Sequence, residues 1–361
     1  MTDRKMFDEC CQTFSTMQDN MKRRKAVWAA IALGALLIAS PPAWSEKHGK
    51  GHKIQPDENI TTEPQAIDAT HENWMAQNKE ALKRLPINRV PLLGSHDAGS
   101  CDVRRGNPPC KGYLTHSGHH LTRKPSSEDV TSARCQSAAI IDQLRYGVRY
   151  LDLRIAHQDN AYWIEHMWMS TPLLGEGGVF AQIKGFLRGH PDEIIVLNMQ
   201  QLWSEKGEMT AKEASAFFRV VQEEFQSLLA PAGDFSSTTL GSVWDGTGRL
   251  IVIGRVDRSP EPFLWDEGQV DSQWMDANHP ETLIQGLNAV VASWHGGQSA
   301  GKLRVLQSMT TTKHKITGAA KTNERIKERL KSDWKNAPLN VVQVDDSVNS
   351  GLMPLLVERL R

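Results

Sequence analysis

Residues 179–198 read VFAQIKGFLRGHPDEIIVLN. Residues 179–187 have the apolar spacing of a helix, and 193–198 form a short apolar run that is typical of a buried strand. The same alternation recurs along the chain. Strands are predicted at 90–94, 148–154, 161–166, 193–198, 249–254, 303–307 and 341–344, and helices at 138–144, 179–187, 211–229, 321–331 and 353–360. Strands that alternate with helices indicate a parallel sheet, and this many units predict an α/β fold, a single distorted (β/α)8 TIM barrel.

The barrel is predicted to occupy residues 67–361, preceded by two segments of another kind. In residues 1–45, a basic cluster at 22–25 precedes an apolar run at 26–39 and small residues, which is typical of a secretory signal peptide. Met21 stands directly before the basic cluster and is a candidate translation start. The apolar run is short for a membrane-spanning helix, so an anchor remains the alternative. Residues 46–66 are polar and predict a linker, so the mature chain is expected to be secreted or periplasmic.

Two stretches of the barrel region differ from its strand-helix rhythm. Residues 68–84 have a roughly helical apolar spacing and predict a short entry helix. Residues 101–135 are rich in Gly, Pro, Ser, Arg and His and predict a long loop, which in a compact domain is usually functional or mobile.

Charge and cysteine content limit the possible functions. The chain has 42 Lys+Arg and 42 Asp+Glu, so it lacks the basic balance that is typical of a nucleic-acid-binding domain. Cys101, Cys110 and Cys135 follow the predicted leader, and in an oxidising compartment two of them are expected to pair. The pairs Cys101–Cys110 and Cys110–Cys135 both stay open. The spacing is a weak signal for zinc, and we expect a structural role.

Polar residues follow many of the predicted strands directly. Because the carboxyl ends of parallel barrel strands meet at one mouth, these side chains are expected to gather there. They are His96, Asp97, Arg154, His166, Gln200, Arg255 and Asp345. Together they form an acid/base set around a cationic centre. Tryptophans near this mouth, such as Trp168 or Trp294, are candidates for contact with a lipid interface.

Four sequence blocks resemble the phosphatidylinositol phospholipase C X-domain family. They are PLLGSHDAGS at 91–100, QLRYGVRYLDLR at 143–154, EH at 165–166 followed by HPDEIIV at 190–196, and NVVQVDD at 340–346. The blocks occur in the order of the family, and the resemblance spans residues 70–361. It implies a phospholipase C-type enzyme, in which the inositol 2-hydroxyl attacks phosphorus and releases diacylglycerol and a cyclic phosphate.

The resemblance also implies a role for each matching residue. His96 is the expected base, and a carboxylate of the last strand orients it. Asp345 directly follows the apolar run and is preferred over Asp346, which stays open. His166 is the expected acid and Asp97 its support. Imidazoles suit both tasks because they titrate near neutral pH.

Arg154 is expected to bind the phosphoryl oxygens through its fork of donors. The animal enzymes of the superfamily place a calcium-binding acid at this position, whereas the metal-independent bacterial enzymes have an arginine, so no metal or other cofactor is expected. Arg255 matches a headgroup arginine. Gln200 stands in place of a headgroup lysine, and Gln307 and Met309 are interpreted as replacements of an acid and a tyrosine. The headgroup therefore remains open.

The expected partner is a phospholipid at a membrane surface, and the chain is expected to be a monomer that binds no nucleic acid. Two alternatives remain. A glycerophosphodiesterase or sphingomyelinase D-like enzyme would also use paired histidines in a barrel, but with acidic metal ligands. A non-catalytic phosphate- or membrane-binding barrel would have lost His96, His166 or Arg154, and the sequence keeps all three.

Overall fold

The computed structural model describes residues 68–117, 125–312 and 315–360. These residues belong to one compact unit of the chain, residues 64–361. The predicted signal peptide (1–45) and linker (46–66) lie outside the described residues. In the part of the chain that is described, no helix combines the length and the apolar character needed to cross a bilayer.

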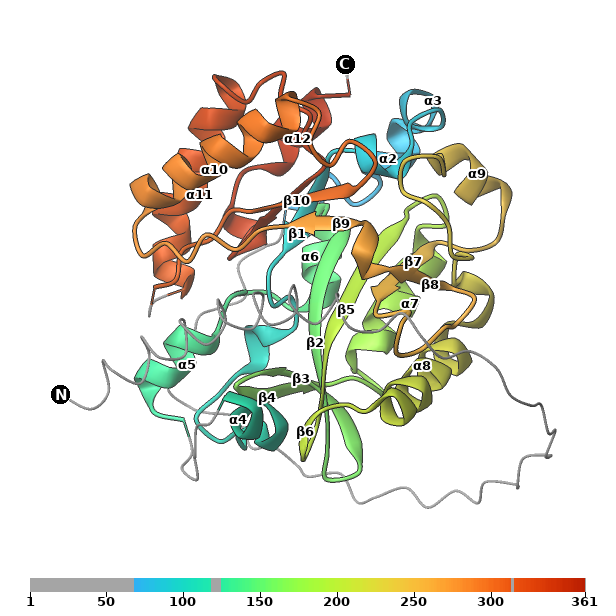
Figure 1. Cartoon of the computed structure of the whole chain (residues 1–361), viewed down its shortest axis with the longest axis vertical. Helices are drawn as coiled ribbons and strands as arrows, with labels where there is room; N and C mark the ends of the chain where they lie inside the picture. Colours follow the sequence, from blue (N-terminus) through green and yellow to red (C-terminus); the bar gives the residue numbers. More distant parts are fainter. Residues whose placement is uncertain (1–67, 118–124, 313–314, 361) are drawn as a thin grey trace, which may run out of the picture. The chain divides into compact units, whose positions relative to one another are not determined.

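Eight parallel strands form the wall of a nearly closed barrel (Figure 1). In spatial order they are β8 (Leu264–Asp266), β7 (Leu250–Gly254), β5 (Ile195–Ser204), β2 (Tyr150–Gln158), β1 (Leu92–Ser95), β11 (Val341–Val344), β10 (Leu303–Gln307) and β9 (Val270–Ser272). The path ends at β8 and β9, and within the described residues no ladder joins these two strands. The prediction of a single distorted TIM barrel is confirmed. The opening between β8 and β9 is the distortion.

Helices cover the outside of the barrel. They are α2 (Trp74–Gln77), α3 (Lys79–Leu82), α4 (Lys111–Ser117), α5 (Ser127–Ala133), α6 (Ile140–Tyr146), α7 (Val179–Gly189), α8 (Ala211–Phe225), α9 (Leu240–Asp245), α10 (Pro280–His295), α11 (Lys315–Lys331) and α12 (Met353–Glu358). In Figure 1, α10 and α11 lie beside β10, and α7 and α8 lie beside β5 and β7. The entry helix predicted at 68–84 is two short helices, α2 and α3.

The prediction of an uninterrupted loop at 101–135 is wrong, because α4 and α5 lie within it. The start of α5 is fixed by a capping box, in which the Ser126 side chain accepts from the Asp129 N–H and the Asp129 carboxylate accepts from Ser126. Both helices are only two turns long, which is too short for apolar periodicity to identify them.

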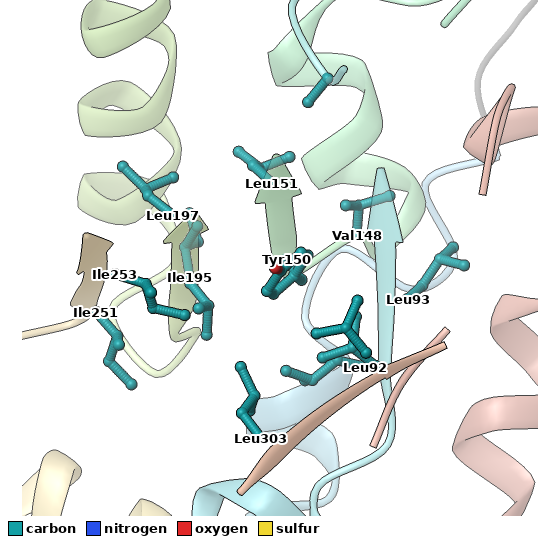
Figure 2. Packing of buried hydrophobic residues seen from close by; sticks show 14 of the residues in the cluster. Leu92, Leu93, Val148, Tyr150, Leu151, Ile195, Leu197, Ile251, Ile253 and Leu303 are labelled. Atoms are coloured by element: carbon teal, nitrogen blue, oxygen red, sulfur yellow. The ribbon is translucent and has the colours of Figure 1, made fainter. Parts of the chain in front are cut away.

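The core consists of side chains from the barrel wall and the inner faces of the helices. Figure 2 shows side chains of β1, β2, β5, β7 and β10 within one cluster, Tyr150 and Leu197 among them. At the amino ends of β2 and β5 lies a fully buried ion pair, in which Arg149 Nη2 is 2.7 Å from Glu193 Oε2. Burying two charges is costly unless they are paired, so the pair fixes how the two strands meet. The candidate site residues lie at the opposite, carboxyl ends of the strands.

The segment that carries His166 is an antiparallel extension outside the barrel wall. The predicted strand at 161–166 is β3 (Ala161–His166), and it pairs antiparallel with β2 instead of joining the barrel wall. A further strand, β4 (Trp168–Pro172), pairs with β3, and a two-residue strand, β6 (Gly207–Glu208), pairs with β5. Ile155 lies opposite Ile164, so the same register continued puts His166, two residues further, at the level of Leu153, next to Arg154.

Candidate active site

His96 directly follows β1 and is held by backbone contacts on both sides. Its N–H donates to Val344 O at 3.1 Å, which joins it to the end of β11. The side-chain amide of Gln136 donates both to His96 O (2.9 Å) and to Val344 O (3.0 Å). This amide therefore fixes the ends of β1 and β11 relative to each other.

Asp345, and not Asp346, contacts the imidazole of His96. His96 Nδ1 lies 2.7 Å from Asp345 Oδ1. The backbone carbonyl of Asp345 accepts from the amide of Asn323, so the residue is held at both ends. Asp346 has a φ of 50° and directs its carboxylate to Ser137 and Asn349. The carboxylate favoured from the sequence is thus the one in contact with His96.

Asp97 is shared between the two imidazoles. Its Oδ2 lies 3.3 Å from His96 Nε2 and 3.3 Å from His166 Nε2. The two rings are 6.3 Å apart between centroids and nearly perpendicular. Asp97 has a φ of 42°, a left-handed conformation that non-glycine residues rarely adopt and that is concentrated at functional sites. The sequence prediction assigned Asp97 to His166 alone, whereas the carboxylate contacts both histidines.

Arg154 lies between the shared carboxylate and His96. Its Nε is 2.5 Å from Asp97 Oδ1, and its Nη2 is 3.1 Å from His96 Nε2 and 4.0 Å from Asp152 Oδ2. Burial favours the neutral acid at Asp97, but Arg154 and the two histidines outweigh it, so the pKa of Asp97 is lowered. The site therefore has an ionised carboxylate beside a permanent cation.

His166, at the end of β3, is the more exposed of the two histidines. Its Nδ1 lies 2.7 Å from Ala133 O, so Nδ1–H donates to this carbonyl and Nε2 faces Asp97. Burial lowers the pKa of His166 to about 4, although the charge of Asp97 opposes this shift. For His96, burial acts in the same direction, but Asp97 and Asp345 outweigh it and raise the pKa. Two neighbouring imidazoles with separated pKa values are the arrangement that acid–base pairs use.

Two buried groups of the site were not predicted. Cys135 lies with its Sγ 3.5 Å from Asp97 Oδ2 and 3.7 Å from His166 Nδ1, and burial raises the pKa of its thiol well above the ordinary value. Glu165 accepts from the N–H of Met167, and burial raises the pKa of its carboxyl to about 7. A cysteine in a loop and an acid in a strand carry no sequence signal for such a role.

The expected disulfide is not present. Cys101, Cys110 and Cys135 are all free and buried. The reason is visible for Cys135, whose thiol faces the carboxylate of Asp97. The expectation that two of the three cysteines pair is therefore wrong for this structure.

An aromatic residue and a lysine complete the site beside His96. The ring of Trp274, which follows β9, is stacked on His96 with centroids 6.0 Å apart and planes 28° apart. Lys315, the first residue of α11, has its Nζ 6.0 Å from the centre of the Trp274 ring. The candidates for lipid contact, Trp168 and Trp294, are instead buried at 1% and 2% exposure.

The two predicted headgroup residues follow or lie within neighbouring barrel strands, β7 and β5. Arg255 follows β7 as predicted, but it pairs with Glu208, Asp257 and Glu267, at 3.1, 3.2 and 3.5 Å. Three carboxylates thus compensate its charge. Gln200 lies in β5, and its side chain is outside the described residues.

The residues interpreted as replacements of an acid and a tyrosine lie at and just after the end of β10. Gln307 donates to Ser272 Oγ at 2.6 Å, and Met309 is buried. The aromatic ring beside His96 is that of Trp274.

Three groups of potential metal ligands overlap in this site. They are His96/Cys135/Asp345, Asp97/Cys135/His166 and His96/Asp97/Asp152. The guanidinium of Arg154 is already in contact with Asp97 and lies near Asp152. A divalent cation at these carboxylates would meet the fixed positive charge of Arg154, so the donor set fits an arginine better than a metal.

The fold and the site together define a class. A parallel α/β barrel with two imidazoles, a shared carboxylate and an arginine at the carboxyl ends of its strands has the groups needed for phosphoryl chemistry.

Comparison with known proteins makes this class of protein more specific. No family model matches the chain. The PI-PLC X domain-containing protein 2 of Homo sapiens is 25% identical over 251 residues, 67% of this chain and 78% of that protein.

Two further proteins are similar. The variant-surface-glycoprotein phospholipase C of Trypanosoma cruzi is 28% identical over 248 residues, 62% of this chain and 63% of that protein. A mutant of the phosphatidylinositol-specific phospholipase C of Staphylococcus aureus has a similar structure, with a TM-score of 0.57 and 18% identity over 80% of this chain and 97% of that one. The chain is thus similar in sequence to proteins with a phosphatidylinositol phospholipase C X domain and similar in fold to a bacterial enzyme of that type, and it is a phospholipase C-like enzyme.

Proposed function

We propose that this chain cleaves phosphatidylinositol or a related phosphodiester lipid into diacylglycerol and a phosphorylated headgroup, with His96 and His166 as general base and acid. One observation carries the proposal: both Nε2 atoms lie 3.3 Å from the same oxygen of Asp97, whose other oxygen contacts Arg154. The names of the relatives support the lipid class. The assignment of roles rests on the geometry of each ring.

His96 is prepared to accept a proton. With Nδ1–H donating to Asp345 at 2.7 Å, the lone pair of Nε2 is directed toward Arg154 and the centre of the site. An inositol lipid has a hydroxyl adjacent to its phosphodiester, which is the nearest nucleophile for this base to activate. Attack by that hydroxyl gives a cyclic phosphate as the first product. Arg154 would neutralise the charge that develops on the phosphoryl oxygens.

His166 is the residue for protonating the leaving oxygen. It is neutral at pH 7 in the free protein, because burial lowers its pKa to about 4. A phosphodiester carries a negative charge, and a negative charge beside an imidazole favours the protonated form. Binding of the substrate therefore raises the pKa of His166 and supplies the acid when it is needed. The proton then passes to the glycerol oxygen as its bond to phosphorus breaks.

We further propose that the reaction is independent of a metal ion, because the cation of Arg154 already contacts the carboxylates that would bind one. A metal-dependent phosphodiesterase is the competing hypothesis. Residues 1–45 are proposed to direct export, which the mass of the mature amino terminus after secretion would test. Export would bring the enzyme to lipid surfaces outside the cytoplasm.

The test is cleavage of phosphatidylinositol vesicles by the purified chain, with EDTA and calcium arms and detection of cyclic phosphate by phosphorus NMR. His96→Ala and His166→Ala are each expected to lower kcat by about 10²–10⁴-fold. His295→Ala is the matched control, because His295 is exposed at the end of α10. Wild-type rates in both site variants would refute the mechanism. Loss of activity in EDTA would refute metal independence, and cleavage of other lipids alone would refute the substrate.

A further inference from the structure

Lys315 is a buried cation that has no carboxylate partner in the described part of the chain. It is 6% exposed, and its ammonium donates to a single acceptor, Thr310 O, at 3.0 Å. Among the described residues, no carboxylate oxygen lies within ion-pair distance of it. An ammonium has three donors, and burying a charge without a partner is costly. The fold itself therefore does not explain why a lysine is buried at this position.

The position of Lys315 connects it to the active site. Its Nζ lies 6.0 Å from the centre of the Trp274 ring, which is stacked on His96. The charge of Lys315 also acts on the site: burial favours the neutral acid at Asp97, and Lys315 is one of the cations that together outweigh it and lower the pKa. Trp274 is only partly buried, so this side of the site has exposed surface next to the buried ammonium.

The remaining charges of the site make an anion the fitting ligand. Arg154 is held by Asp97 at 2.5 Å, so part of its charge is compensated within the protein. Asp345 is likewise engaged by His96 at 2.7 Å. Lys315 is thus a cation at the Trp274 side of the site whose remaining donors are left for a ligand. A lysine ammonium binds phosphate oxygens as a point charge, without the fixed geometry of arginine.

We propose that Lys315 is a second phosphate-binding residue of this site, positioned by the face of Trp274 and by Thr310 O to bind an anionic phosphate oxygen of the substrate. The inference extends the proposed function and rests on it for the lipid. The phosphate has two possible sources, the phosphodiester that is cleaved or a further phosphate on the headgroup. Both present the same oxygen anion to Lys315, and the experiment distinguishes them.

The experiment compares Lys315→Met with wild type and with Lys321→Met, a control at an exposed lysine of the same helix. Binding of inorganic phosphate is followed by phosphorus NMR, and kcat/KM is measured on vesicles with phosphatidylinositol or phosphatidylinositol 4-phosphate. Lys315→Met is expected to weaken phosphate binding about tenfold or more, and Lys315→Arg to retain it. An equal loss of kcat/KM on both lipids identifies the cleaved phosphodiester, and a loss on the 4-phosphate lipid alone identifies a headgroup phosphate.

Unchanged phosphate binding and unchanged kcat/KM on both lipids in Lys315→Met would overturn the inference. So would a folded Lys315→Arg that loses phosphate binding as fully as Lys315→Met, because charge would then not be the cause. Melting temperatures are recorded for all variants, and Lys315→Gln replaces Lys315→Met if the latter does not fold. If wild type cleaves neither lipid but binds inorganic phosphate through Lys315, the proposed function fails and this inference stands.

Discussion

Replacing Asp345 by Asn tests the orientation of the base directly. The charge-assisted hydrogen bond at 2.7 Å between His96 Nδ1 and Asp345 Oδ1 contributes about 1.5–3 kcal/mol, or about 10- to 150-fold in rate. The Asn amide can also donate to Nδ1, which would move the proton to Nε2 and remove the lone pair that accepts from the substrate. Loss of a general base costs about 10²–10⁴-fold, so a fall in kcat/KM within that range is expected on phosphatidylinositol vesicles.

The neighbouring residue supplies the control. Asp346→Asn changes the same atoms one residue away, where the carboxylate contacts Ser137 and Asn349 and not an imidazole. It is expected to keep kcat/KM within about threefold of wild type. Because Asp345 helps to raise the pKa of His96, Asp345→Asn should also move the His96 titration to lower pH. Near-normal activity of Asp345→Asn, or equal losses in both variants, would refute the reasoning.

Three further outcomes are expected. Arg154→Lys keeps a charge but loses the fork that contacts Asp97 and His96, so kcat should fall by about 10²–10³-fold, whereas Arg255→Lys, in its separate ion-pair network, should stay within about threefold. The productive form of the enzyme needs a neutral His96 and a protonated His166. The pKa of His166 is about 4 and the pKa of His96 is raised, so kcat/KM on a soluble phosphodiester should not change with pH between these two pKa values. The value of kcat/KM should fall below the pKa of His166, where both rings are protonated, and above the pKa of His96, where both rings are neutral. An NMR titration in which His166 is the more basic ring would contradict this expectation. Glu165→Gln removes an acid whose pKa burial raises to about 7, so the variant should be more stable than wild type at pH 8, by up to ~3 kcal/mol in denaturant unfolding, and equal to it near pH 4. A destabilised variant at pH 8 would show that the carboxylate is favourably paired there.

Much of the barrel could be predicted because its strands are short, continuous apolar runs. The strands at 303–307 and 341–344 were predicted with the bounds that the structure has, and Asp345 follows the second of them. The first residue after such a run continues into the mouth of the barrel, whereas Asp346 turns away through its left-handed φ. Selecting the polar residues that directly follow predicted strands therefore identified the residues around His96.

The parts that were missed depend on long-range geometry. Nothing in the sequence shows that β3 turns back along β2, although this pairing returns His166 to the part of β2 that carries Arg154. Trp274 follows β9, a strand of three partly buried residues without an apolar run. Cys135 lies in a loop, and Lys315 begins a helix whose predicted start, 321, was six residues too late because its first turns are polar. Local sequence patterns identify the helices and strands, but they do not show which loops contribute side chains to the site.

The opening between β8 and β9 separates the site into a fixed part and an adaptable part. His96 and Asp345 follow β1 and β11, each of which has a bonded strand on both sides. Trp274 follows β9, which among the described strands bonds to β10 alone. Insertions and substitutions in the segment from β8 to Trp274 break no ladder on the far side of β9. Changes along this one edge of the wall can therefore alter what surrounds Trp274, while the contact between His96 and Asp345 keeps its support from both neighbouring strands.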